Sequence, residues 1–113
     1  MSNNTWTKKA ADYLINLNVY KNAIQCMREL ISVCPDEELS DRLRQTERLV
    51  ACIESTLRTM TDEDLFFLEK MFICRGDQPV DDVCAECMME KSNVYRLRKR
   101  ALEKFTMAMY GRL

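Results

Sequence analysis

Apolar residues recur along the first third of the chain at alternating intervals of four and three positions. The series comprises Trp6, Ala10, Tyr13, Leu17, Tyr20, Ile24, Met27, Ile31 and Cys34. This spacing places the side chains in one stripe along an amphipathic helix. Asn16 and Asn18 are weak helix formers, so we expect the helix to bend or divide around Leu17.

A second stripe with the same spacing begins after a break at Pro35. It comprises Leu39, Leu43, Thr46, Val50, Ile53, Leu57 and Met60. At the break, a proline followed by the acidic Asp36, Glu37 and Glu38 is typical of the start of a new helix. Because the connection is short, the two helices should lie antiparallel and form a helical hairpin over residues 6–60.

Shorter helices are predicted in the second half of the chain. Thr61 precedes Asp64 by three positions, which is a capping signal for a helix that begins there. Gly76 is expected to end this helix in the left-handed conformation. Pro79 is expected to begin a fourth helix. The apolar face of that helix comprises Val80, Val83, Cys84 and Cys87.

The last predicted helix spans residues 91–110 and stops at Gly111. Its inward-facing residues are expected to be Val94, Leu97, Ala101, Phe105 and Ala108. Arg98 falls within the same apolar arc. We therefore expect its charged end to extend toward solvent or to pair with Asp81 or Asp82 of the preceding helix.

The composition favours an all-α fold. Only two glycines and two prolines occur in 113 residues, too few for the turns of a many-stranded sheet. We expect a heptad-patterned helical hairpin at residues 1–60, which serves interaction, and a trihelical helix-turn-helix region at residues 61–113. No apolar run is long enough to span a bilayer, and the first residues lack the pattern of a secretory signal. A soluble, cytoplasmic protein without a membrane partner is expected.

The available side chains argue against catalysis. Histidine is absent, which removes the most common general base and the most common metal ligand. No glycine-rich phosphate loop is present, so we expect no enzyme, no catalytic residue and no cofactor. The six cysteines lie in apolar helical patterns and are expected to be buried free thiols. Cys84 and Cys87 form a Cys-x-x-Cys pair without the second pair that a zinc site requires, so no metal site is expected.

Charge is segregated toward the end of the chain. Residues 91–113 contain seven of the 17 basic residues and one of the 18 acidic residues, a net +6 (seven minus one) in a chain with a total of −1. An acidic helix followed by a basic helix is typical of a helix-turn-helix that binds duplex DNA. In the major groove, asparagine and arginine read base edges, whereas serine and lysine bind phosphates. The polar arc of the last helix comprises Ser92, Asn93, Arg96, Lys99, Arg100 and Lys104, together with the acidic Glu103, and Tyr95 lies at its boundary.

The segment VDDVCAECMMEKSNVYRLRKRALEKF resembles the C-terminal region of the ArpU/RinA-type phage late-gene transcriptional regulators, which is similar to the promoter-binding end of sigma factors. The resemblance covers roughly residues 61–110 and is closest over NVYRLRKRALEKF. It implies a phage or prophage regulator that binds a promoter-proximal site in double-stranded DNA. By position, it assigns the groove-facing start of the recognition helix to Lys91, Ser92, Asn93, Tyr95 and Arg96, and the flank to Lys99 and Arg100.

The chain departs from this family pattern at the turn. Met88, Met89 and Glu90 stand where the family usually has a glycine, an apolar residue and a serine cap. A methionine at a position that often needs a positive φ implies strain or a different turn. Glu90 also places a carboxylate near the phosphates, which bears on DNA affinity.

Two other functions stay open at this point. One is a phage packaging or replication accessory factor that uses the same helix-turn-helix. The other is an adaptor whose hairpin binds RNA polymerase or another protein, and salt-dependent DNA binding would distinguish it from the first two functions. A homodimer through residues 6–60 is also predicted, because additional apolar residues widen both stripes. These residues are Leu14, Ala23, Leu30 and Leu49.

Overall fold

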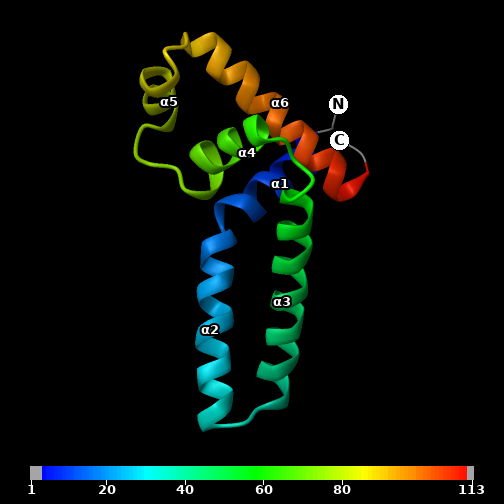
Figure 1. Ribbon diagram of the computed structural model, residues 1–113. Coiled ribbons are helices and arrows are strands. Elements are labelled where there is room, and N and C mark those ends of the chain that lie inside the picture. The colour runs from blue at the N-terminus through cyan, green and yellow to red at the C-terminus, as the bar shows by residue number, and fades with distance from the viewer. Residues whose placement is uncertain (1–3, 112–113) are drawn as a thin grey trace.

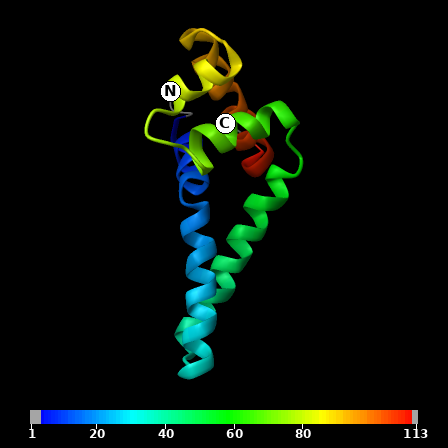
Figure 2. The same cartoon turned by 60° about the vertical axis from the view of Figure 1, so that its left-hand side comes forward.

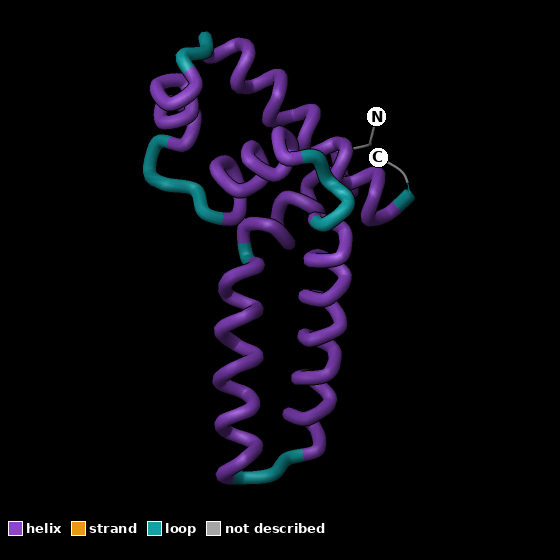
Figure 3. The backbone as a smooth tube through the Cα atoms, in the orientation of Figure 1, coloured by secondary structure: helices purple, strands orange, loops and turns teal. Residues whose placement is uncertain are grey.

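The computed structural model describes residues 4–111, and this part of the chain is helical without any strand. The predicted all-α fold class is confirmed. Figures 1 and 3 show two long helices that extend away from the cluster formed by the other helices. No helix within the described residues is long and apolar enough to cross a membrane. The elements are α1 (Asn4–Ile15), α2 (Leu17–Val33), α3 (Glu37–Leu57), α4 (Asp62–Leu68), the π-helix η1 (Glu69–Ile73), α5 (Pro79–Cys87) and α6 (Lys91–Tyr110).

Helices α2 and α3 form an antiparallel hairpin whose tip points away from α5 and α6 in both ribbon views (Figures 1 and 2), while α3 also contacts α6. Ile24 of α2 and Val50 of α3 are buried, as their places in the two stripes predict. The hairpin turns at the predicted break, where the Asp36 carboxylate accepts a hydrogen bond of 3.1 Å from the Leu39 amide. This cap satisfies an amide that the first turn of α3 would otherwise leave unpaired.

Two ion pairs lie along one edge of the hairpin. Lys21 Nζ is 2.7 Å from Glu54 Oε2, and Arg28 Nη2 is 2.6 Å from Glu47 Oε2. Lys21 and Arg28 are seven residues apart, so they share one side of α2. Because all four side chains are more than a third exposed, each pair contributes only about 0–1 kcal/mol.

The predicted hairpin over residues 6–60 is shorter in the structure, because α1 turns away from it at Asn16. The backbone of Asn16 has φ −96° and ψ 5°, and its side-chain amide donates a hydrogen bond of 2.9 Å to the Asp12 carbonyl. The division predicted around Leu17 is thus confirmed, and α1 lies against α6 and η1 instead. Leu14 is therefore completely buried in the core, and its predicted part in self-association is wrong.

The core lies where α1, α3, α4, η1, α5 and α6 meet. Phe105 of α6 is its largest completely buried side chain. Residues from both sides of position 60 share this one cluster. They include Ala10, Leu14, Ile53, Leu68, Met71, Val83, Val94 and Phe105. Helix α6 is consequently held by elements from both halves of the sequence.

The third predicted helix begins as expected but ends before Gly76. The Thr61 hydroxyl caps α4 by accepting a hydrogen bond of 3.2 Å from the Asp64 amide. After α4 the helix continues as the wider π-helix η1. The last π-type hydrogen bond joins the Cys74 amide to the Glu69 carbonyl at 2.7 Å. Gly76 lies beyond this end and has no positive φ. The predicted left-handed stop at Gly76 is therefore wrong.

The start of α1 and the end of α6 are joined by an aromatic contact. The ring centroids of Trp6 and Tyr110 are 4.8 Å apart. The Tyr110 hydroxyl is buried and has no hydrogen-bond partner among residues 4–111. Burial, and secondarily the nearby Tyr13, raises the pKa of Tyr110 above its ordinary value of 10.0.

The cysteines differ from the prediction of buried thiols. All six are free, and Cys84 and Cys87 are half-buried beside the core. The other four lie in α2 and α3 or just beyond a helix end, and they are exposed. The exposed thiols are those of Cys26, Cys34, Cys52 and Cys74.

Candidate nucleic-acid interface

Helices α5 and α6, joined by a short turn, lie at the end of the molecule opposite the hairpin tip (Figure 1). Pro79 occupies the first turn of α5, as predicted. Val83 is completely buried, and Cys84 and Cys87 lie half-buried against the same core. The apolar face of α5 thus fixes the helix on the core and sets the position of the turn that leads into α6.

Met88, Met89 and Glu90 form the turn. Met88 adopts the left-handed conformation, with φ 54° and ψ 45°, and within residues 4–111 no other non-glycine residue has a positive φ. This conformation costs a residue with a side chain about 1–2 kcal/mol. Glu90 is the N-cap of α6, but its side chain makes no capping hydrogen bond. The amides of the first turn of α6 therefore lack a side-chain acceptor.

Helix α6 has the predicted bounds, Lys91–Tyr110. Of the residues predicted to face inward, Ala108 is exposed. The covered face of α6 is wider in its second half, where Leu102 and Thr106 are also buried, since α1, α3 and α4 all lie against this helix. The other four predicted inward residues are buried, namely Val94, Leu97, Ala101 and Phe105.

Arg98 covers an aromatic ring of the core. Its guanidinium carbon is 4.9 Å from the centroid of the Phe72 ring, a cation–π geometry. The predicted pairing of Arg98 with Asp81 or Asp82 is not observed among the described residues. Asp81 instead lies 3.5 Å from Lys91 Nζ, and both of these side chains are more than half exposed.

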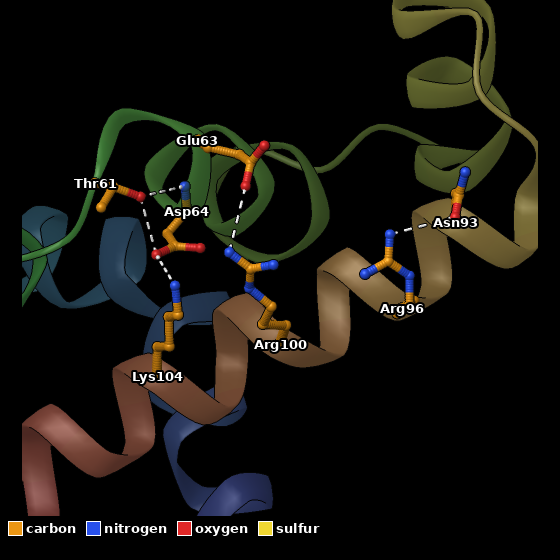
Figure 4. Close-up of polar contacts among 7 residues, drawn as sticks. All are labelled: Thr61, Glu63, Asp64, Asn93, Arg96, Arg100 and Lys104. Carbon is orange, nitrogen blue, oxygen red and sulfur yellow. Dashed lines mark hydrogen bonds and ion pairs between the residues drawn. The ribbon is translucent and has the colours of Figure 1, made fainter.

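The first half of α6 directs a group of polar side chains to solvent. Nη2 of Arg96 donates a long hydrogen bond of 3.4 Å to Oδ1 of Asn93 (Figure 4). Lys99 is exposed and has no ion-pair partner among residues 4–111. Residues 91–99 contain four cations and no acidic residue. We name the exposed group Ser92, Asn93, Tyr95, Arg96 and Lys99 the α6 polar surface.

The second half of α6 uses its cations differently. Arg100 Nη2 is 3.8 Å from Glu63 Oε1, and Lys104 Nζ is 3.3 Å from Asp64 Oδ2, across the contact between α6 and α4 (Figure 4). The Asp64 side chain is only 5% exposed, and it also accepts a 3.0 Å hydrogen bond from the Thr61 hydroxyl. Arg100 and Lys104 therefore face α4, and the single exposed arc predicted from the sequence is divided between two environments.

The sequence pattern contained a signal for this division that the capping interpretation did not use. The acidic residues Glu63 and Asp64 serve the start of α4, but they also complement Arg100 and Lys104, which are one helical turn apart. Opposite charges on two helices indicate a contact only when the helices are known to be neighbours. The tertiary structure supplies that knowledge.

Comparisons of the chain with protein-family models, curated proteins and solved structures found no match. Within residues 4–111, no three cysteine, aspartate or glutamate side chains come together in a group that could hold a metal ion.

Proposed function

We propose that this protein is a sequence-specific DNA-binding transcriptional regulator of the phage or prophage type, with the first half of α6 in the major groove of duplex DNA. The observation that supports this most is the α6 polar surface, which is exposed, basic and free of acidic residues, directly after a tight interhelical turn. A helix of this kind at one end of a molecule can enter a groove without obstruction from the rest of the fold.

The side chains of the α6 polar surface divide by chemistry. Asn93 and Arg96 have the paired donors and acceptors that read adenine and guanine edges. Ser92 and Lys99 suit phosphate oxygens, and the uncapped amides at the start of α6 add attraction for a phosphate. Arg100 and Lys104 have a different role in this proposal, because they orient α6 on α4 and so aim the polar surface.

The resemblance of residues 79–105 to the ArpU/RinA-type regulators favours a promoter-proximal DNA site and RNA polymerase as a further partner. An adaptor function is favoured by a separate observation, the exposed apolar residues of α2. A packaging or replication factor would share the DNA contacts but would need no promoter-like sequence. DNA binding and sequence preference therefore separate the three functions.

The test is selection of bound duplexes from a random pool, followed by titration of the selected duplex at several salt concentrations. Replacing Arg96 by Ala should weaken binding to the preferred site by about 1–3 kcal/mol and relax its sequence preference. Replacing Lys99 by Ala should weaken all duplexes alike and lower the slope of log K against log salt by about one. Arg48→Ala is the matched control, since Arg48 is an exposed cation of the hairpin.

The proposal fails if the wild-type protein binds no duplex at low salt, and the adaptor function then stands. Equal losses for Arg48→Ala and Lys99→Ala would show that binding depends on overall charge and not on the α6 polar surface. Binding without any selected sequence would favour the packaging or replication factor.

A further inference from the structure

Helix α2 has two apolar stripes, and only one of them is covered. The covered stripe packs toward α3 and includes the buried Ile24 and Met27. The second stripe also repeats at intervals of four, three, four and three, which is the spacing of a coiled-coil seam. Its members are Val19, Ala23, Cys26, Leu30 and Val33.

The second stripe is exposed to an unusual degree for apolar side chains. Val19 is 60% exposed, Leu30 58% and Val33 85%. On a helical projection this stripe lies opposite Lys21 and Arg28, whose ion pairs with α3 occupy the other edge of α2. Within residues 4–111, Ala23 is half-buried and the other four members of the stripe are exposed, although isolated apolar side chains would not repeat with a heptad period.

We infer that this stripe is the seam of a homodimer in which α2 of one copy packs antiparallel against α2 of a second copy. We place the two helices in the register in which Val19 contacts Leu30 of the second copy and Ala23 contacts Cys26 of the second copy. The two small side chains at the centre allow the helices to approach closely, while the larger ones close the ends of the seam. The inference is independent of the proposed function.

The edges of the stripe favour a second copy in the antiparallel direction. One edge carries Asn22 and Glu29, and the other carries the buried Met27 and the half-buried Tyr20. In an antiparallel pair, the edge with Asn22 and Glu29 on one copy lies beside the same edge of the second copy. Glu29 therefore faces the Asn22 amide of the second copy. Parallel pairing would instead set the Glu29 carboxylate, which accepts a hydrogen bond of 3.2 Å from the Gln25 amide, against the apolar edge and away from the Asn22 amide.

The lack of charge on this face also favours self-association over an unrelated charged partner. Glu29 is the one ionisable carboxylate beside the stripe, and no lysine or arginine borders it on the projection. The seam is two heptads long, about 21 Å. An interface of this size falls in the weak class, so we expect a dissociation constant on the order of micromolar.

An antiparallel dimer has a geometric consequence. The two helical clusters lie at opposite ends of the paired hairpins, so the two α6 helices point away from each other. Such a dimer would not read half-sites one helical turn apart, as many helix-turn-helix dimers do. Under the proposed function, such a dimer would join two separate segments of duplex DNA.

The first experiment measures the oligomeric state by sedimentation from low to high micromolar concentration. The wild type should change from monomer to dimer over this range. Leu30→Glu should raise the dissociation constant about tenfold or more, because a carboxylate would enter the seam. Ser32→Glu is the matched control, since it adds the same charge in the same turn on another exposed face of α2. Circular dichroism should show unchanged helix content for both variants.

The second experiment determines the direction of pairing with a short bismaleimide linker. One protein keeps Cys26 as its exposed thiol, and the other keeps Cys34, with the remaining exposed cysteines replaced by serine or alanine. In the antiparallel register the two Cys26 residues are about 5 Å apart along the axis and the two Cys34 residues about 28 Å. Cross-linking is therefore expected for the Cys26 protein alone.

A wild type that remains monomeric throughout, or a dimer that Leu30→Glu and Ser32→Glu weaken equally, would overturn the inference. Cross-linking of both single-thiol proteins would overturn the antiparallel direction and indicate parallel pairing. Loss of dimer in Leu30→Glu with unchanged affinity for DNA per chain would support the seam and leave the proposed function to its own test.

Discussion

The two halves of α6 have the same kind of residues and different environments. Arg96 and Lys99 extend into solvent, while Arg100 and Lys104, one helical turn further along, meet carboxylates of α4. The difference comes from the neighbours: α4 begins with three acidic residues, and two of these, Glu63 and Asp64, pair with cations of the second half of α6. A basic face on a helix thus stays open to solvent where it is uncovered and becomes a structural contact where an acidic helix end approaches it.

The two structural ion pairs also differ from each other. Lys104 meets a carboxylate that is 5% exposed, whereas Arg100 meets one that is 57% exposed at the longer distance of 3.8 Å. Screening by water makes the second pair weak, whereas removing the partner of a buried carboxylate leaves an uncompensated polar group. The contact between α6 and α4 should therefore depend on Lys104 far more than on Arg100.

The largest expected effect follows from the core of the second half. Replacing Phe105 by Ala should lower the free energy of unfolding by about 3–5 kcal/mol, because it removes the largest fully buried side chain. Urea denaturation followed by circular dichroism measures the loss. Met107→Ala is the control on the same helix, since Met107 is 47% exposed and should cost far less. Equal losses in the two variants would contradict the assignment of the core to this side of α6.

The next effect separates the two ion pairs. Lys104→Met should destabilise the protein by about 1–3 kcal/mol, because the buried Asp64 carboxylate keeps only the Thr61 hydroxyl as a side-chain donor. Arg100→Met should cost less than about 1 kcal/mol. The same denaturation experiment compares the two, and a larger cost for Arg100→Met would show that burial does not decide which pair stabilises the contact.

The smallest effect concerns the turn that begins the first half. Met88→Gly should stabilise the protein by about 1 kcal/mol, since glycine adopts the left-handed conformation without the steric cost. The Met88 side chain is 92% exposed, so its removal forfeits little packing. Met89→Gly is the control, because Met89 is half-buried and has no positive φ. A destabilised Met88→Gly protein would show that the methionine side chain makes a favourable contact.

Local signals predicted most helix boundaries correctly. The break at Pro35, the Thr61 cap, the start at Pro79 and the span of α6 all depend on interactions within a few residues, which a sequence displays directly. Gly76 was the exception, because η1 ended the helix first through a π-type hydrogen bond. No residue type marks such a bond in advance.

Properties that depend on neighbours far along the chain were predicted poorly. Leu14 is in the core and Ala108 is exposed, although both lie on extensions of regular apolar patterns. The burial of Leu14 depends on the direction in which α1 leaves Asn16. The exposure of Ala108 depends on which helices cover α6. The stripe with the greatest exposure, on α2, was read only in part from the sequence, through Ala23 and Leu30.

By itself, the sequence determined an all-helical chain, the start and end of α6, and a cluster of cations on that helix, because periodicity, capping and charge are local properties. The tertiary structure alone decided which cations remain free, since that depends on where α4 lies. It also decided which of the two stripes on α2 is covered, because either stripe has the spacing to pack against a helix and only one faces α3.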